Sequence, residues 1–244
     1  MNDIFSRTQM LIGEDGLNLL KQKTVAVFGI GGVGSYSVEA LARSGIGKLI
    51  LIDNDEIAPS NINRQIHANI KTVGQPKVEA MKNRILDINP ELQVLIHQKL
   101  YNTNTSAELL LDSYDYVIDA IDMVSAKIDL IERCTSRNIN IISAMGAGNK
   151  LDPSQLKITD IFKTSVCPLA KVMRHELRKR GVKKLDVVYS TELPIKPLES
   201  SNGETKGRQT PGSIAFVPAV SGLMIASVVI RNLLNIKVNS KFPS

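Results

Sequence analysis

Residues 25–35 read Val-Ala-Val-Phe-Gly-Ile-Gly-Gly-Val-Gly-Ser, and this stretch decides the fold. An apolar run rich in β-branched residues leads into a glycine turn, and a helical pattern begins at Val33. Gly29, Gly31 and Gly34 fit the spacing G-x-G-x-x-G, in which the glycines permit a tight turn, a close approach of phosphate oxygens and close helix–strand packing. The helix start also offers unpaired N–H groups to an anion. The stretch therefore predicts strand, phosphate-binding loop and helix, rather than an ordinary glycine turn.

Strands and helices alternate over the first 150 residues. We expect strands at 24–29, 49–53, 92–96, 114–120 and 140–144. Helices are expected between them, at 33–45, 76–89, 106–111 and 124–138. This alternation is typical of a parallel sheet with right-handed crossovers, and strands at 156–162 and 186–190 read as antiparallel additions. The predicted fold is α/β: a Rossmann-like, doubly wound, mostly parallel sheet extended by antiparallel strands in the C-terminal part.

The chain length of 244 residues suits one large domain or two small ones. Neither an internal repeat nor a linker-bounded second domain is evident. We therefore expect a single domain over residues 1–244, with a nucleotide-binding core at about 24–150 and a substrate-side part at about 151–244. Residues 1–23 are expected to form a helical arm. The apolar run 214–230 contains Pro218 and Gly222, and it predicts a buried closing helix rather than a membrane anchor, which needs about 20 apolar residues.

The amino-acid composition limits the classes of molecule that this protein is expected to bind. A net charge of +6 favours anionic partners, although many soluble proteins carry such a charge without one. Aromatic residues make up only 4% and tryptophan is absent, so stacking platforms for single-stranded nucleic acid are scarce. The two cysteines, Cys134 and Cys167, form no C-x-x-C pair, which excludes a four-thiolate zinc site. This cysteine usage favours the reducing cytoplasm.

Polar residues follow the expected strands. Asp53 ends the second strand 19 residues after Gly34, where an acid typically binds a ribose hydroxyl, the alternative being an ordinary capping acid. The polar segment 53–65 has no helical or strand period, and long irregular loops in compact domains are usually functional. Lys77, at a helix start, would be tolerated there beside a bound anion. Asp119 and Asp122, past a strand end, suit Mg²⁺ or ribose binding.

The densest positive charge lies in the expected basic helix 168–180 and just beyond it. Its members are Lys171, Arg174, Arg178, Lys179, Arg180, Lys183 and Lys184. Charge pattern alone leaves two interpretations open, a solvated helix face or a surface that contacts the phosphates of a large anion. The following segment, 192–213, is rich in proline, glycine and charge, and it predicts a mobile loop.

Motifs in a fixed order identify a resemblance. They are Gly-Ile-Gly-Gly-Val-Gly-Ser (29–35), Asp-Asn-Asp (53–55), Ser-Asn-Ile-Asn-Arg-Gln (60–65), Val-Gly-Gln-Pro-Lys (73–77), Asp-Ala-Ile-Asp (119–122) and Pro-Ala-Val-Ser-Gly-Leu (218–223). Together they resemble the E1-like adenylating superfamily, which activates carboxylates with ATP. The short length and the segments 7–13, 144–150 and 168–174 look most like the tRNA threonylcarbamoyladenosine dehydratases within it.

The resemblance implies an activity and its partners. That activity is ATP-dependent dehydration, by cyclisation, of N6-threonylcarbamoyladenosine in tRNA through carboxylate adenylation, with release of AMP and pyrophosphate. ATP and Mg²⁺ are the implied cofactors, tRNA the substrate and a homodimer the assembly. Cooperation with a sulfur-transfer system of the cysteine desulfurase type is left open. Zinc and a membrane are not expected.

The resemblance also assigns roles residue by residue. The implied catalytic residues are Arg64, Lys77 and Asp122, with Asp122 also placing Mg²⁺ through ATP. The implied nucleotide-binding residues are Gly29, Gly31, Gly32, Gly34, Asp53, Asp55, Asn61, Arg64, Gln65, Lys77, Asp119, Asp122 and, from the partner subunit, Arg7. The tRNA-binding residues are expected in the basic helix, at Lys171, Arg174, Arg178, Lys179 and Arg180.

Three alternatives remain at this level. The first is an adenylyltransferase that activates the C-terminal glycine of a ubiquitin-like sulfur carrier, although such relatives usually hold zinc on two C-x-x-C pairs. The second is a nicotinamide-dependent dehydrogenase, which would leave four polar residues unused: Asn61, Arg64, Lys77 and Asp122. The third is a non-catalytic scaffold, which has no need for cations beside phosphates.

Overall fold

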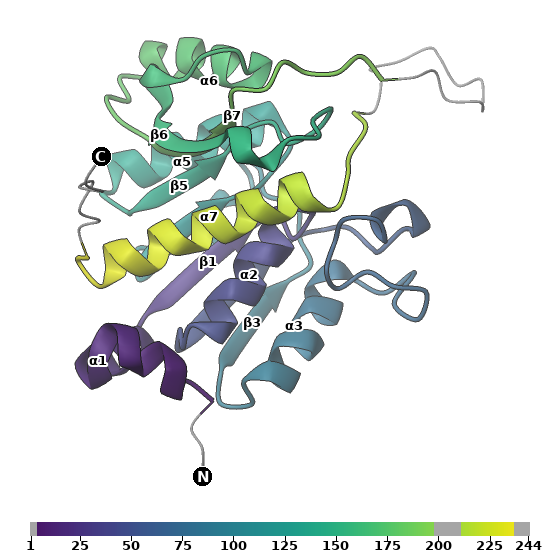
Figure 1. Cartoon of the computed structure of the whole chain (residues 1–244). Coiled ribbons are helices and arrows are strands. Elements are labelled where there is room, and N and C mark those ends of the chain that lie inside the picture. The colour runs from purple at the N-terminus through teal and green to yellow at the C-terminus, as the bar shows by residue number, and fades with distance from the viewer. Residues whose placement is uncertain (1–3, 198–210, 237–244) are drawn as a thin grey trace, which may run out of the picture.

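The computed structural model describes residues 4–197 and 211–236, and these form an α/β fold around one seven-stranded sheet (Figure 1). The strand order is β3-β2-β1-β4-β5-β7-β6. The strands are β1 (Thr24–Phe28), β2 (Lys48–Ile52), β3 (Gln93–His97), β4 (Tyr116–Asp119), β5 (Ile141–Ala144), β6 (Leu156–Asp160) and β7 (Asp186–Ser190). All neighbouring strands are parallel except β6 and β7, so the predicted fold class is confirmed.

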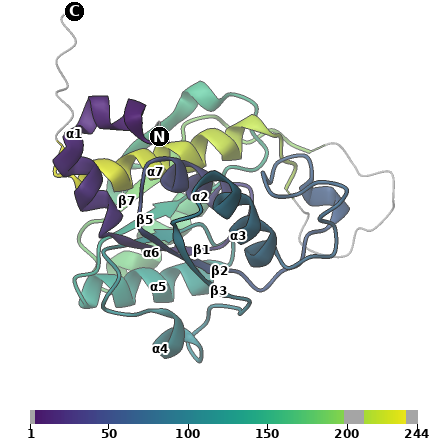
Figure 2. The same cartoon turned by 90° about the horizontal axis from the view of Figure 1, so that it is seen from below.

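Helices cover both faces of this sheet (Figures 1 and 2). The α-helices are α1 (Ser6–Lys21), α2 (Gly34–Arg43), α3 (Lys77–Ile88), α4 (Ser106–Leu109), α5 (Val124–Ser136), α6 (Pro168–Lys179) and α7 (Phe216–Leu233). Helices α1, α2, α3 and α7 lie on one face, and α4, α5 and α6 on the other. Side chains alternate accordingly along β1: Val25 and Val27 join the core under α2 and α7, while Ala26 and Phe28 join the core under α5.

The strand order places the switch point of the fold between β1 and β4. The chain passes outward from β1 through β2 to β3 and then returns to the other side of β1 as β4. Connections leave β1 and β4 in opposite directions, which opens a crevice at the carboxyl ends of the strands, where ligands bind in folds of this kind. The glycine loop, Asp53 and the Asp119–Asp122 segment all follow strands at this edge.

The C-terminal part differs from the prediction in two respects. Strand β7 is parallel to β5 and extends the parallel sheet, so of the two expected antiparallel additions only β6 runs against its neighbour. The expected strand 156–162 is also shorter, because a 3₁₀ turn at Ile161–Lys163 ends it. Part of the predicted mobile loop, residues 198–210, lies outside the described residues.

Helix α7 is the apolar closing helix expected from the sequence. Among the described residues it alone is long and apolar enough to cross a membrane, yet more than half of it is buried within the fold. It packs very closely on α2, because a Cβ at Gly222 would lie 2.3 Å from the Val33 carbonyl oxygen, and the Ser37 hydroxyl donates to the Gly222 carbonyl at 3.0 Å. This contact brings Pro218 beside Gly32, so α7 supports the glycine loop.

Candidate active site

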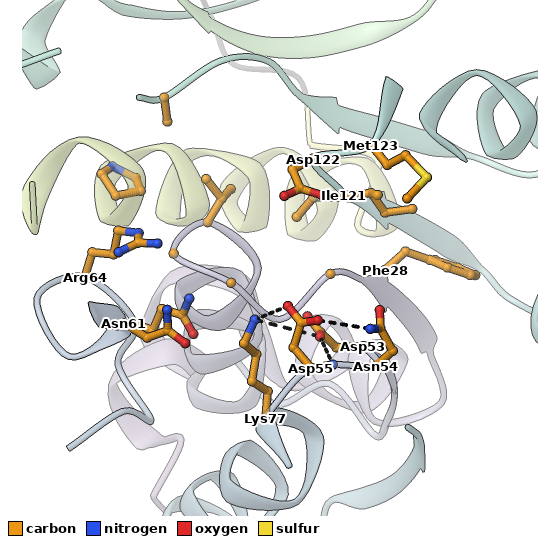
Figure 3. Close-up of a pocket in the computed structure, with 18 of the residues that line it drawn as sticks. Phe28, Asp53, Asn54, Asp55, Asn61, Arg64, Lys77, Ile121, Asp122 and Met123 are labelled. Atoms are coloured by element: carbon orange, nitrogen blue, oxygen red, sulfur yellow. Dashed lines mark hydrogen bonds and ion pairs between the residues drawn. The ribbon is translucent and has the colours of Figure 1, made fainter. Parts of the chain in front are cut away.

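A cavity of about 670 Å³ opens at the carboxyl ends of β1, β2 and β4 (Figure 3). Most of the side chains and glycines that the sequence assigned to a nucleotide line it. They are Gly29, Gly31, Gly32, Asp53, Asp55, Asn61, Arg64, Gln65, Lys77 and Asp122. Gly34, Asp119, Arg7 and the five basic residues predicted to bind tRNA, four in α6 and Arg180 just after it, do not line it.

The glycine loop is built for close approach. Gly29 has φ +90°, and a Cβ there would lie 2.6 Å from the Ala120 carbonyl oxygen. A Cβ at Gly34 would lie 1.8 Å from the Gly29 carbonyl oxygen, so Gly34 keeps helix and strand in contact without facing the cavity. Helix α2 has no side-chain cap, so the positive end of its dipole meets the glycine loop and favours an anion there.

Asp53 holds this loop in place. One carboxylate oxygen accepts the N–H of Ile30 at 2.6 Å, between the first two glycines, and the other accepts the N–H of Asp55 at 2.9 Å. Burial raises the pKa of the Asp53 carboxyl above its usual value, while the nearby Lys77 ammonium acts to lower it. Asp53 therefore orders the phosphate loop and also lines the cavity beside it.

Lys77 is the buried cation of the cavity (Figure 3). Its side chain is only 7% exposed, and its ammonium lies 2.6 Å from a carboxylate oxygen of Asp55 and 4.0 Å from one of Asp53. The side chain of Asp55 is 56% exposed, so this counter-ion can turn toward solvent when an anion enters. The arrangement can neutralise a phosphate at the start of α3.

The loop after β2 supplies the remaining polar wall. The guanidinium of Arg64 donates to the Ser60 carbonyl at 2.8 Å and to the Asn63 side chain at 2.9 Å. Asn61 accepts the N–H of Ala58 at 3.1 Å, which fixes the short 3₁₀ turn Pro59–Asn61. The side-chain oxygen of Gln65 is buried and has no partner among the described residues, so it is left to pair with a ligand or water.

The two acids at the end of β4 and just after it, Asp119 and Asp122, differ in burial and direction. Asp122 is exposed and lines the cavity across from Lys77 (Figure 3). Asp119 is fully buried, forms an ion pair with Lys127 at 2.9 Å and does not line the cavity where a nucleotide contact was expected. The position of Asp119 at a strand end does not reveal its direction in the fold, because the side chain of an acid there can point into the core as well as out of it.

The donor set suits Mg²⁺ held together with phosphates. No cluster of three metal-ligating side chains occurs in the part of the chain that the structure describes, and Asp122 is a single exposed carboxylate. Mg²⁺ usually binds through one or two carboxylates plus substrate phosphates and water, so Asp122 fits that mode. A dedicated all-protein metal site is not formed by these residues.

Sequence reasoning missed the apolar end of the cavity. Phe28, Leu100, Tyr101 and Met123 line it, and the rings of Phe28 and Tyr101 meet edge to face with centroids 5.0 Å apart. The Tyr101 hydroxyl donates to Asp129 at 2.8 Å, which fixes the ring. Phe28 ends β1, Leu100 and Tyr101 lie between β3 and α4, and Met123 lies between β4 and α5, so only the tertiary structure brings them together. Leu100 and Met123 are exposed, while the rings of Phe28 and Tyr101 are buried, and this end of the cavity has the apolar character that a nucleobase needs.

A second missed wall comes from residues before α7. Gly148 and residues 211–213 line the cavity, and Asn149 joins them through two hydrogen bonds with Gly212, at 2.6 and 2.8 Å. The Asn63 side chain donates to the Ser213 carbonyl at 3.0 Å, which links this wall to the loop after β2. The predicted core and the predicted substrate-side part thus share one cavity.

The basic residues of α6 lie outside the cavity and are partly engaged. Arg174 donates to the Thr164 carbonyl at 3.0 Å. Arg180 pairs with Glu176 at 2.8 Å and with Glu132 at 3.3 Å, and Lys179 pairs with Glu176 at 3.2 Å. Arg178 lies over the ring of Phe162, 5.1 Å from its centroid. Lys171 is exposed, as is Arg7 on α1.

Comparison with known proteins gives consistent results. Residues 5–243 match the ThiF family. The chain is 47% identical over 239 residues to the tRNA threonylcarbamoyladenosine dehydratase of Bacillus subtilis (strain 168), and the match covers 94% of each chain. The fold is similar to crystal structures of E. coli tRNA N6-threonylcarbamoyladenosine dehydratase in complex with AMP and with ATP. The TM-score is 0.86 for both, with 38% and 37% identity over 95% of this chain and 94% and 93% of the other.

Proposed function

The chain belongs to the ThiF family, and on this premise we propose that it catalyses the ATP-dependent dehydration of N6-threonylcarbamoyladenosine in tRNA. The observation that carries the proposal is the match to a named dehydratase along nearly the whole length of both chains. The cavity supports it, because it combines a glycine loop with cationic and acidic side chains at one sheet edge. A sulfur carrier as substrate is disfavoured, since the match to a tRNA-modifying enzyme covers 94% of both chains.

We propose one orientation of ATP in the cavity. The phosphates would lie on the glycine loop and the start of α2, where N–H groups face an anion. The ribose would lie by Asp53, and the base against the apolar end formed by Phe28, Leu100 and Met123. Arg64 and Lys77 would then flank the phosphates from the opposite side, with Asn61 and Gln65 beside them.

Adenylation requires two negatively charged groups to meet. A carboxylate oxygen of the substrate attacks the α-phosphorus of ATP, the bond to the bridging oxygen breaks, and pyrophosphate leaves. Arg64 and Lys77 would offset the repulsion and stabilise the charge on the leaving group. Asp122 would hold Mg²⁺ against the phosphates, and the ion would supply further charge neutralisation there.

The second step is a ring closure. The acyl adenylate carries a good leaving group on its carbonyl carbon. A nitrogen or oxygen of the same threonylcarbamoyl side chain attacks that carbon, loses its proton and expels AMP, so one oxygen of the original carboxylate departs with AMP. The attack is intramolecular, and therefore orientation of the side chain supplies much of the rate.

The wider assembly follows from the family resemblance. We infer a homodimer in which Arg7 of one subunit completes the nucleotide site of the other, and a cytoplasmic enzyme that binds tRNA through α6. A sulfur-transfer partner stays an open proposal. An active protein that sedimented as a monomer at assay concentration would contradict the shared site.

The decisive experiment measures AMP formed from ATP and Mg²⁺. Transfer RNA that carries threonylcarbamoyladenosine is compared with the same tRNA lacking the modification. AMP that appears only with the modified tRNA supports both adenylation and the substrate class. Turnover with a glycine-tailed carrier protein, and none with either tRNA, would replace the proposal with the sulfur-carrier alternative.

A further inference from the structure

An ion pair is sealed inside the fold directly behind the active site. Asp119 ends β4, and Lys127 lies in α5, one turn after its start. Both side chains are 0% exposed, and their charged atoms are 2.9 Å apart. The Ser143 hydroxyl on β5 donates to the same oxygen of Asp119 at 2.6 Å. Burying two charges is expensive, and an apolar pair of similar volume is often at least as stable, so fold stability alone explains this pair poorly.

The Asp119 and Lys127 side chains both form hydrogen bonds with the backbone of Ile121, the residue that precedes Asp122. The second oxygen of Asp119 accepts the N–H of Ile121 at 3.2 Å, and the ammonium of Lys127 donates to the carbonyl of Ile121 at 3.2 Å. One peptide segment is thus held from both of its polar groups, by two charged side chains that cannot move. The side chain of the next residue, Asp122, is exposed and is not held by such hydrogen bonds among the described residues.

We propose that Asp119 and Lys127 are positioning residues, which hold the backbone of Ile121 so that the Asp122 carboxylate faces the phosphates and their magnesium ion. The proposal rests on the proposed adenylation function. It explains why a lysine and an acid are buried at this point of the sheet. It also assigns Asp119 an indirect role in place of the nucleotide contact expected from the sequence.

The test replaces the pair by apolar residues of similar size, Asp119→Leu/Lys127→Met. A control does the same to a second Asp–Lys pair, which lies just before β1 and β4. Asp115, just before β4, pairs with Lys23 at 2.9 Å and accepts the N–H of Thr24 at 2.8 Å, at the opposite edge of the sheet. The control is Asp115→Leu/Lys23→Met, and thermal unfolding reports whether each variant folds.

The readout is ATP–pyrophosphate exchange with tRNA that carries threonylcarbamoyladenosine. We expect the Asp119→Leu/Lys127→Met variant to lose about ten- to a hundredfold in kcat, the usual effect of removing an outer-shell support. The Mg²⁺ concentration for half-maximal rate should rise with it. The control variant should keep the wild-type rate and Mg²⁺ dependence. Equal behaviour of the two variants would overturn the proposal.

A double-mutant cycle separates positioning from a general loss of structure. In an Asp122→Ala background, the same two substitutions should cost little more, because the residue that they position is gone. Losses that multiply in full would show that the pair acts through something other than Asp122 and would also overturn the proposal. A wild-type protein that forms no AMP contradicts instead the proposed function.

A milder variant covers the case in which the double substitution does not fold. Ser143→Ala removes one hydrogen bond from Asp119 and leaves the ion pair intact. We expect an about threefold lower kcat with unchanged KM for ATP, and no effect in the Asp122→Ala background. An unchanged kcat in a folded Ser143→Ala protein, or the same loss in both backgrounds, counts against the positioning role.

Discussion

Two lysines at the same edge of the sheet form ion pairs with aspartates and have opposite surroundings. Lys77 begins α3 and faces the cavity, with a counter-ion, Asp55, that is more than half exposed. Lys127 lies in α5 and is sealed with Asp119, which is equally buried. The first pair can open to receive an anion, while the second can only hold backbone in place. The comparison shows that an Asp–Lys pair near a strand end predicts charge at that edge but not what the charge does.

The largest expected effect concerns two cations that line the cavity, Lys77 of the Lys77–Asp55 pair and Arg64. Lys77→Ala and Arg64→Ala should each lower the rate of ATP–pyrophosphate exchange by about 10²–10³, because each removes one group that stabilises developing charge. Circular dichroism checks that the fold is intact. Near-normal exchange in both variants would contradict their assignment.

The next prediction compares how much the fold loses in unfolding free energy when the Lys127–Asp119 pair or the Lys77–Asp55 pair is broken. Lys127→Met leaves the buried Asp119 carboxylate unpaired and should lower the free energy of unfolding by about 3–5 kcal/mol. Lys77→Met leaves Asp55 able to reach water and should cost about 1 kcal/mol or less. Urea unfolding of both variants measures the difference. Equal losses would mean that the two pairs are not distinguished by burial.

A buried histidine near Lys77 gives a pH test of the same region. His67 is 3% exposed, and neither ring nitrogen has a partner among the described residues. Burial, and then the Lys77 and Arg84 charges, lower the pKa of His67 from 6.5 to about 4. The unfolded chain therefore binds a proton between those values while the folded one does not, so stability falls as the pH drops through this window.

His67→Phe removes this titration and should flatten the dependence. The expected difference between the two proteins is about 3 kcal/mol of unfolding free energy between pH 7.5 and pH 4. It is measured by urea unfolding at several pH values. Parallel curves for the two proteins would show that His67 is not the group responsible.

The smallest effect concerns the basic helix outside the cavity. Lys171→Ala should weaken tRNA binding a few-fold and lower the slope of log affinity against log salt by about 0.7–0.9, as expected for one lost phosphate contact. The kcat at saturating tRNA should stay unchanged. A salt dependence identical to that of the wild type would exclude Lys171 from the tRNA surface.

The amino-acid sequence by itself determined the strands, the order of the motifs and the polar, glycine-rich part of the cavity wall. It could do so because Gly29 and Gly34 have positions that no side chain fits, and because strands alternating with helices place every strand end at one edge. The parallel direction of β7 was not predictable, since a short apolar strand reads alike in either direction.

The tertiary structure alone decided which charges face the cavity and which are sealed behind it. Asp119 and Asp122 are three residues apart after one strand, yet the first pairs with Lys127 and the second lines the cavity. The direction of each side chain depends on how α5 packs under β4, and this packing is not a local property of the sequence. The apolar end of the cavity likewise exists only because the end of β1 meets the connections after β3 and β4, which bring Phe28, Tyr101 and Met123 together.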